Sequence, residues 1–303
     1  MKHEARIIKS RPKITAALIA DATGVRAKTA EFGAIGDVAS THSDHVLTYA
    51  KDRRYASAVN ANRNISGVFC TEEIAPLIRE GVETLICDDP NWAYCTLLDR
   101  VGKDVVWQPS VVNSRFADAT IDPVGVYIGE NVSIGPGSRI LKGSYIEDNT
   151  TIRANAVLGG SGFQHQATSK GILSPEHDGF LIVESGAEIG PHAFISMGFC
   201  YRSTRIGRNT KLDTHVYVAH GAHIGAECII GASAVILGHV VIGDHCHIGP
   251  NAALNNRIRV GDRATVSMGS VATKDVAPGQ RVTGNFAVDH EIFLRNLKAA
   301  AAS

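Results

Sequence analysis

Aromatic residues are scarce in this chain, at 6% of its 303 residues, which argues against a core built on bulky rings. Net charge is absent as well, because 30 lysines and arginines balance 30 aspartates and glutamates. Nucleic acids and anionic membranes attract proteins with a basic excess. The balanced composition therefore indicates neither kind of partner.

Disulfide and membrane signals are also missing. The six cysteines include no CxxC pair, and the chain is too long for a small disulfide scaffold. Free thiols are typical of a reducing compartment, so a cytoplasmic protein is expected. No apolar run is long enough to span a bilayer, and the first twenty residues lack the apolar core of a signal peptide.

Glycine, by contrast, is abundant at 30 residues, and the sequence repeats with a period of six. Shorter runs of this period lie at residues 128–158 and 183–195. A helix would need spacings of three and four, and a half-buried strand would alternate at two. The longest run has eleven aliphatic positions: Ile206, Leu212, Val218, Ile224, Ile230, Ile236, Ile242, Ile248, Leu254, Val260 and Val266.

This period predicts a parallel β-helix in which each hexad forms one short strand and one corner. The aliphatic residue points inward, a mostly small residue four positions later fits under the turn, and three hexads close one triangular coil. Residues 18 apart then stack, so Cys228 and Cys246 are expected to pack as core thiols. Glycine follows many of the aliphatic residues, where we expect the corners to need open backbone angles.

Two interruptions break the repeat. Residues 159–182 form a long insertion rich in turn-forming residues. Such a loop on a rigid coil is commonly functional, and a disordered insertion is the alternative. The second break leaves eleven residues instead of twelve between Ile195 and Ile206, which predicts a bulge at CYRST.

The two ends of the chain lack the period. Residues 1–110 alternate strand and helix patterns and predict a small α/β domain. The β-helix is expected over residues 111–283, and residues 284–303 predict a turn followed by a helix with Asp289 as its N-cap.

Four motifs carry a family resemblance: LTYAKDRRY in the first domain, GGSGF at the start of the insertion, KLDTHVYVAHGAHIG, and VTGN. With them the chain resembles the lipid A N-acyltransferases, the UDP-3-O-(3-hydroxyacyl)glucosamine N-acyltransferase family of hexapeptide-repeat enzymes. The resemblance implies a left-handed β-helix and a homotrimer with active sites between neighbouring β-helices. It implies no metal and no tightly bound cofactor. The implied substrates are a UDP-linked amino sugar and an acyl group on acyl carrier protein.

The resemblance also implies roles for individual residues. The catalytic histidine falls on His220, the acid beside it on Asp213, and the amide that faces the oxyanion on Gly238. The pair that holds the uracil falls on Tyr49 and Tyr55. Three further residues are expected to contact substrate: Phe163 in GGSGF, His239 and Arg257.

The chain departs from the family pattern in two places. Ser196, Met197 and Gly198 stand where Asp-Arg-Gly is usual, and Arg257 replaces a histidine associated with the acyl donor. Arg257 begins a locally basic end of the chain, which suits an acidic carrier protein and equally the phosphates of coenzyme A. The donor is therefore expected to be a phosphopantetheine thioester, either acyl carrier protein or acyl-CoA.

The residues support the same chemistry independently. Amide formation needs a base for the attacking amine, and a neutral imidazole suits that task. Asp213 precedes His220 by seven residues, so a contact is feasible, and Gly238 follows by 18, directly above it in the stack. Most of the thirteen histidines are expected to be ordinary corner residues, with His223 and His239 as alternatives for the base.

Three other functions remain open at this point. A short-chain transferase would use acetyl-CoA on a nucleotide-linked amino sugar with the same fold and base. A carbonic anhydrase of the β-helix type would bind zinc through three histidines, although no convincing ligand spacing is present. A β-helix without catalytic activity is the third.

Overall fold

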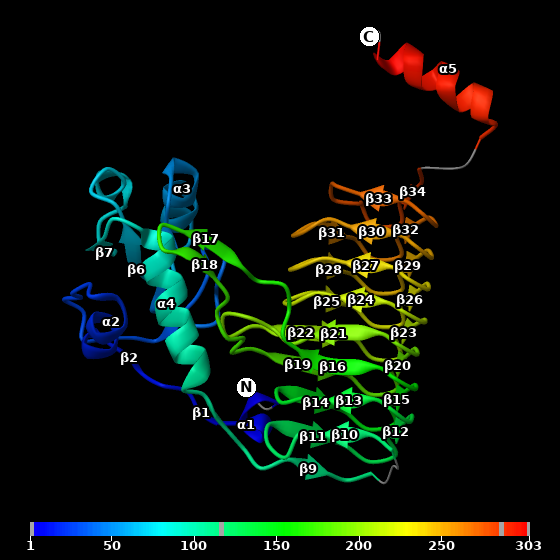
Figure 1. The fold of residues 1–303 in the computed structure, drawn as a ribbon, viewed down its shortest axis with the longest axis horizontal. Helices are drawn as coiled ribbons and strands as arrows, with labels where there is room; N and C mark the ends of the chain where they lie inside the picture. The colour runs from blue at the N-terminus through cyan, green and yellow to red at the C-terminus, as the bar shows by residue number, and fades with distance from the viewer. Residues whose placement is uncertain (1–2, 115–117, 285–287, 302–303) are drawn as a thin grey trace.

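The computed structural model describes residues 3–114, 118–284 and 288–301. Figure 1 shows a tall stack of short strands with a smaller domain of helices and strands beside it. The helix α5 (His290–Ala301) extends from the upper end of the stack. The predicted fold class, mainly β on a parallel β-helix, is confirmed.

The stack has three faces, each an eight-stranded parallel sheet. One sheet holds β10 (Thr120–Ile121), β13 (Arg139–Ile140), β16 (Val157–Gly160), β21 (Phe194–Ser196), β24 (Tyr217–Val218), β27 (Val235–Ile236), β30 (Ala253–Leu254) and β33 (Val271–Ala272). The second holds β9 (Val111–Val112), β11 (Val126–Ile128), β14 (Ser144–Ile146), β19 (Phe180–Val183), β22 (Ser203–Ile206), β25 (His223–Ile224), β28 (Val241–Ile242) and β31 (Arg259–Val260). The third holds β12 (Ser133–Ile134), β15 (Thr151–Ile152), β20 (Glu188–Ile189), β23 (Lys211–Leu212), β26 (Ile229–Ile230), β29 (His247–Ile248), β32 (Thr265–Val266) and β34 (Arg281–Val282).

The predicted inward positions form the core of the stack. All eleven aliphatic residues of the long run are buried, and residues 18 apart are paired in register, as Ile230 with Ile248. The two core thiols are confirmed too: Cys228 and Cys246 are buried, and the Cys246 N–H lies 3.4 Å from the Cys228 sulfur. Each fully buried isoleucine stabilises the fold by roughly 1.5–3 kcal/mol, so the coils hold one another together.

The reason expected for the corner glycines is wrong. The left-handed backbone angle falls three residues after each aliphatic position, on residues such as Asn209, Glu227 and Arg257. The glycine directly after the aliphatic residue has no such angle; it is needed because the next coil lies against it. A Cβ on Gly207 would lie 2.3 Å from the backbone of Gly225.

The N-terminal domain is built on a four-stranded parallel sheet. The predicted alternation of strands and helices is confirmed, and Asp52 and Asp89 cap α3 and α4 by accepting backbone N–H groups. The elements are α2 (Ala16–Thr23), β4 (Ala34–Ile35), β5 (Val46–Ala50), α3 (Arg53–Ala61), β6 (Ile65–Cys70), the 3₁₀ turn η1 (Ala75–Leu77), β7 (Glu83–Ile86) and α4 (Pro90–Lys103).

Short antiparallel pairs flank this sheet. β2 (Ile14–Thr15) pairs with β3 (Glu31–Phe32), and β1 (Ile8–Ser10) pairs with β8 (Val106–Trp107). Helix α1 (Glu4–Ile7) and β1 pack on the β-helix through a cluster that includes Tyr145 and Phe180. The start of the first domain therefore lies directly on the face of the stack.

The long insertion is ordered, so the alternative of a disordered loop is wrong. It forms a hairpin of β17 (Gln166–Thr168) and β18 (Gly171–Leu173) that reaches α4. There the Asn91 amide donates to the Ala167 carbonyl at 2.8 Å, and the Ser169 N–H donates to Asp89 at 2.6 Å. The insertion thus ties the β-helix to the first domain.

The predicted bulge is present and is held by a buried carboxylate. Cys200 and Tyr201 have left-handed angles, and their N–H groups donate to Asp178 at 2.7 and 3.1 Å. Asp178 is fully buried, and Arg11 of the first domain contacts it at 3.5 Å. Burial raises the pKa of Asp178, while Arg11 and the N–H donors oppose that rise.

The C-terminal helix begins as expected, because the Asp289 carboxylate accepts the N–H groups of Glu291 and Ile292. The turn predicted before it falls on residues 285–287, outside the described residues. Among the helices that the structure describes, none combines the length and apolarity needed to cross a membrane.

Close approach between coils predicts the effect of adding one methyl group. Gly207→Ala places a Cβ against backbone, which cannot rotate away, so we expect a loss of about 1–3 kcal/mol of stability. Thermal unfolding followed by circular dichroism measures it. Gly284→Ala is the matched control, because no atom of the described residues lies within 4 Å of its Cβ position. Equal melting temperatures for the two variants would contradict the explanation.

Candidate active site

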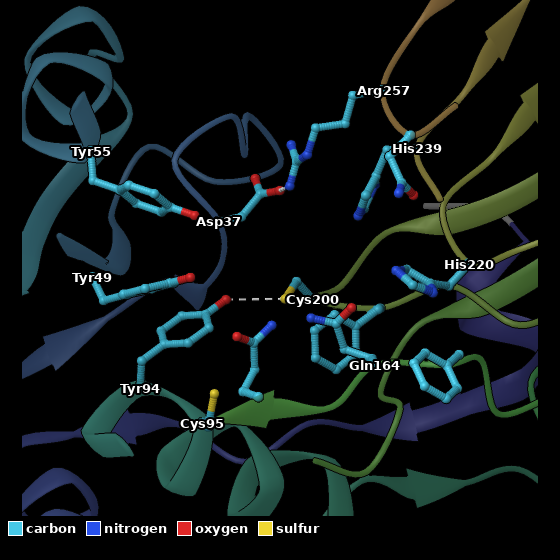
Figure 2. A pocket seen from close by; sticks show the side chains of 14 residues that line it. Asp37, Tyr49, Tyr55, Tyr94, Cys95, Gln164, Cys200, His220, His239 and Arg257 are labelled. Atoms are coloured by element: carbon cyan, nitrogen blue, oxygen red, sulfur yellow. Dashed lines mark hydrogen bonds and ion pairs between the residues drawn. The ribbon is translucent and has the colours of Figure 1, made fainter. Parts of the chain in front are cut away.

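A cavity of about 320 Å³ lies between the first domain and the β-helix. Figure 2 shows three tyrosines at one end and histidines from the β-helix at the other. Fourteen residues line it: Asp37, Tyr49, Tyr55, Tyr94, Cys95, Phe163, Gln164, Gln166, Phe199, Cys200, His220, His239, Asn256 and Arg257. Seven of the eight residues expected in the site are here or contact it, and Asp213 is the exception.

His220 lies in the corner between β24 and β25 and is 7% exposed. Its Nδ1 is buried without a hydrogen-bond partner among the described residues, and its ring contacts those of His177, Phe199 and His239. Burial lowers the pKa of His220, and the charge of Arg257 lowers it further. The imidazole is therefore neutral near pH 7, as a general base must be.

Gly238 follows one coil later and faces the ring of His220. A Cβ on Gly238 would lie 3.1 Å from His220 Nε2. The stacking is fixed by the next residue, whose N–H donates to the His220 carbonyl at 3.1 Å. The N–H of Gly238 itself donates to no residue that the structure describes, so it remains available to a bound oxygen.

Asp213 is not in the cavity, and the expected contact with His220 is absent within the described chain. Its carboxylate is exposed and accepts the N–H of Thr214 at 2.6 Å. The reason is the geometry of the hexad: Asp213 precedes β24 and His220 follows it, so a strand separates the two corners.

Tyr49 and Tyr55, the pair expected to hold the uracil, come from β5 and α3, and their ring centres lie 5.3 Å apart. A third tyrosine, Tyr94 of α4, has its ring centre 4.6 Å from that of Tyr49. Its hydroxyl oxygen lies 3.1 Å from the Cys200 sulfur. Burial raises the pKa of Tyr49 and Tyr94 above the ordinary value, so both hydroxyls stay protonated. Tyr94 was missed because a tyrosine on the buried side of a helix usually indicates core packing.

The insertion covers the middle of the cavity. Phe163 is 79% exposed at its edge, and its ring meets that of His165 edge-on at 4.5 Å. Beside it the Gly162 N–H donates to His177 Nε2 at 3.1 Å. Burial lowers the pKa of His177 to about 4, so this histidine is a neutral acceptor that holds the insertion against His220.

A network of charges closes the cavity between the tyrosines and the histidines. Asp37, in the loop after β4, pairs with Arg202 at 3.0 Å and with Arg257 at 3.3 Å. Burial alone would raise the pKa of Asp37, but the two guanidinium groups lower it below its usual value. The sequence motifs give no sign of Asp37 or Arg202, since they lie 165 residues apart.

Of the two alternatives for the base, His239 lines this cavity and His223 lies outside it. His223 is on β25, and its Nε2 is 2.9 Å from the Ser203 carbonyl. His220 is therefore a better candidate for the base than His223. In the part of the chain that the structure describes, no group of three or more His, Cys, Asp or Glu residues lies close enough to hold a metal ion.

The β-helix matches two models of the hexapeptide repeat. Bacterial transferase hexapeptide (six repeats) covers residues 125–160 and 203–238, and the hexapeptide repeat of succinyl-transferase covers residues 239–274. These ranges coincide with the period of six. They support the left-handed form of the β-helix that the resemblance implied.

The matched proteins include two named UDP-3-O-acylglucosamine N-acyltransferase. The one from Helicobacter pylori is 25% identical over 221 residues, which is 64% of this chain and 63% of the relative. The one from Rippkaea orientalis is 45% identical over 140 residues, which is 46% of this chain and 40% of the relative. The chain thus spans less than two thirds of the length of these relatives.

A solved structure of a UDP-N-acetylglucosamine acyltransferase from Campylobacter jejuni is 20% identical, with a TM-score of 0.47. It covers 61% of this chain and 82% of its own. The names of these relatives agree with the family resemblance that the sequence motifs carry. The chain therefore carries hexapeptide repeats, and over part of its length it is similar to proteins named UDP-3-O-acylglucosamine N-acyltransferase.

Proposed function

We propose that the protein transfers an acyl group from a phosphopantetheine thioester to the amine of a UDP-linked amino sugar, as in lipid A biosynthesis. One observation carries the proposal: the neutral imidazole of His220, which lines a cavity that ends in tyrosines, faces Gly238, whose N–H is available. A base and an oxyanion donor on opposite sides of one space suit acyl transfer. The named relatives support the choice of substrates.

The reaction assigns each group a step. His220 Nε2 takes a proton from the amine as its nitrogen bonds to the thioester carbonyl. The carbonyl oxygen becomes negative, and the Gly238 N–H donates to it. The C–S bond then breaks, and the imidazolium returns the proton to the departing thiolate. For Nε2 to accept that proton, resting His220 must carry its own proton on Nδ1.

The nucleotide is proposed to bind at the tyrosine end of the cavity. Tyr55 is partly exposed there, and the Lys51 ammonium lies 5.2 Å from the centre of its ring. An aromatic face stacks on a nucleobase, and a neighbouring cation suits a pyrophosphate. Tyr49 is 9% exposed, so its ring packs behind the uracil rather than offering a free face for stacking.

The donor is proposed to approach along the basic corner of the β-helix. A second cavity, of about 840 Å³, adjoins the first there and is lined by Arg202, Arg257 and Arg259. Guanidinium groups suit both the phosphates of coenzyme A and an acidic carrier protein. We favour acyl carrier protein over acyl-CoA, and we propose no tightly bound cofactor.

A cytoplasmic homotrimer completes the proposal. The family resemblance implies active sites between neighbouring β-helices. The exposed position of Asp213, away from its own His220, is compatible with a role toward a neighbouring copy.

The test is an assay with UDP-3-O-acylglucosamine and matched acyl carrier protein and acyl-CoA donors, acetyl-CoA included. We expect N-acylation, and His220→Ala should lower kcat by at least about a hundredfold, the usual effect of losing a general base. The control His247→Ala removes an exposed histidine from β29 and should be nearly silent. No product with any donor, or normal turnover by a folded His220→Ala variant, would refute the proposal.

The lowered pKa of His220 gives a prediction for pH. Only the neutral base accepts a proton, so kcat/KM should fall as the pH drops through a pKa below the ordinary 6.5. Arg257→Asn removes a charge that lowers this pKa, so the fall should move to higher pH. Asparagine tolerates the left-handed angle at this position. Arg263→Asn, at another left-handed corner outside the cavity, should leave the profile unchanged.

The tyrosine end of the cavity gives a prediction for substrate binding. Tyr55→Ala should raise KM for the sugar nucleotide about tenfold and largely keep kcat, because stacking acts on ground and transition states alike. Competition by UDP and by GDP measures base selectivity. An unchanged KM, or equal inhibition by both nucleotides in the wild type, would place the uracil elsewhere.

A further inference from the structure

Asp37 is fixed before it meets the β-helix. The Ala39 N–H and the Ser40 hydroxyl donate to its Oδ1 at 2.9 and 3.2 Å, which holds the carboxylate at the tip of its loop. From there it contacts two arginines of the β-helix. The carboxylate is therefore a rigid anchor that the first domain extends across the cavity.

Arg202 links this anchor to His239. Its Nη2 donates to Asp37 at 3.0 Å, and its Nη1 lies 3.4 Å from His239 Nδ1. A guanidinium group has donors and no acceptor, so Nδ1 of His239 must accept. Burial lowers the pKa of His239 to about 3, with Arg257, His220 and Arg202 acting in the same direction and Asp37 against them. A neutral ring that accepts at Nδ1 carries its proton on Nε2.

The backbone holds the ring of His239 in place. The residue occupies a left-handed corner with φ of 60°, and it stacks over Gly221, where a Cβ would lie 2.5 Å from His239 Nδ1. Its ring lies edge-on to that of His220, with centres 5.2 Å apart. Figure 2 shows it projecting into the cavity between Arg257 and His220.

We propose that Asp37 and Arg202 are positioning residues that fix His239 in the Nε2–H tautomer, so that it presents a hydrogen-bond donor to a substrate oxygen beside His220. This inference rests on the proposed function for its kinetic consequence but not for its structural one. The juxtaposition requires the first domain to be docked, because the anchor comes from that domain.

The tautomer is read directly by NMR. Protein labelled with ¹⁵N-histidine gives two-bond N–H correlations that distinguish Nδ1–H from Nε2–H, and His239→Asn assigns the signal by its loss. We expect His239 as the Nε2–H form at neutral pH. Arg202→Met should shift it toward a mixture, and Asp37→Asn should do the same. Arg202→Lys, which keeps a cationic donor, should retain part of the wild-type signal.

Arg205→Met is the matched control. Arg205 lies on β22, three residues after Arg202, but pairs outside the cavity with Glu184, so its loss should leave the tautomer unchanged. A wild-type His239 signal of the Nδ1–H form would overturn the inference. Identical spectra from Arg202→Met and Arg205→Met would overturn it as well.

Kinetics then test whether the tautomer matters. Arg202→Met and Asp37→Asn should each lower kcat/KM about tenfold or more, while Arg205→Met stays near the wild type. In the His239→Asn background, Arg202→Met should cost little further, because its effect passes through His239. Fully additive losses would overturn the positioning role. An inactive wild type with an Nε2–H signal would instead refute the proposed function alone.

Discussion

The whole structure depends on the close contact between successive coils of the β-helix. Backbone lies against backbone at the glycines that follow many of the aliphatic residues, and the aliphatic residues stack every 18 positions. This spacing puts Gly238 over His220 and Arg257 over His239, so the repeat that stabilises the fold also sets the distances in the site. The site is therefore a property of the stack rather than of a flexible loop.

The two interruptions of the repeat attach the first domain, and with it the tyrosines of the site, to the β-helix. The insertion reaches α4, and the bulge sends Phe199 and Cys200 into the core of the first domain. The buried carboxylate of Asp178 holds the bulge and contacts Arg11 across the domain boundary. Without these breaks the stack would present a uniform face, and the tyrosines would have no fixed relation to His220.

Periodic features could be predicted from the sequence, and long-range ones could not. The strands, the buried thiols and the stacking of His220 with Gly238 follow from the six-residue repeat and the 18-residue coil. Tyr94, Asp37 and Arg202 were missed, since their proximity depends on how two domains dock, which no local pattern encodes. The expected contact between Asp213 and His220 is absent because strand β24 lies between them, so the two residues occupy different corners of the coil.

The charges around the cavity favour neutral groups inside it. Arg202 and Arg257 share the single carboxylate of Asp37, so the cluster keeps one positive charge, and His220 and His239 both have lowered pKa values. The same field would lower the pKa of a substrate ammonium bound beside them. In the proposed reaction both partners must be uncharged before the proton moves: the amine to attack and the imidazole to accept. The ion cluster that joins the domains thus favours the reactive form of each.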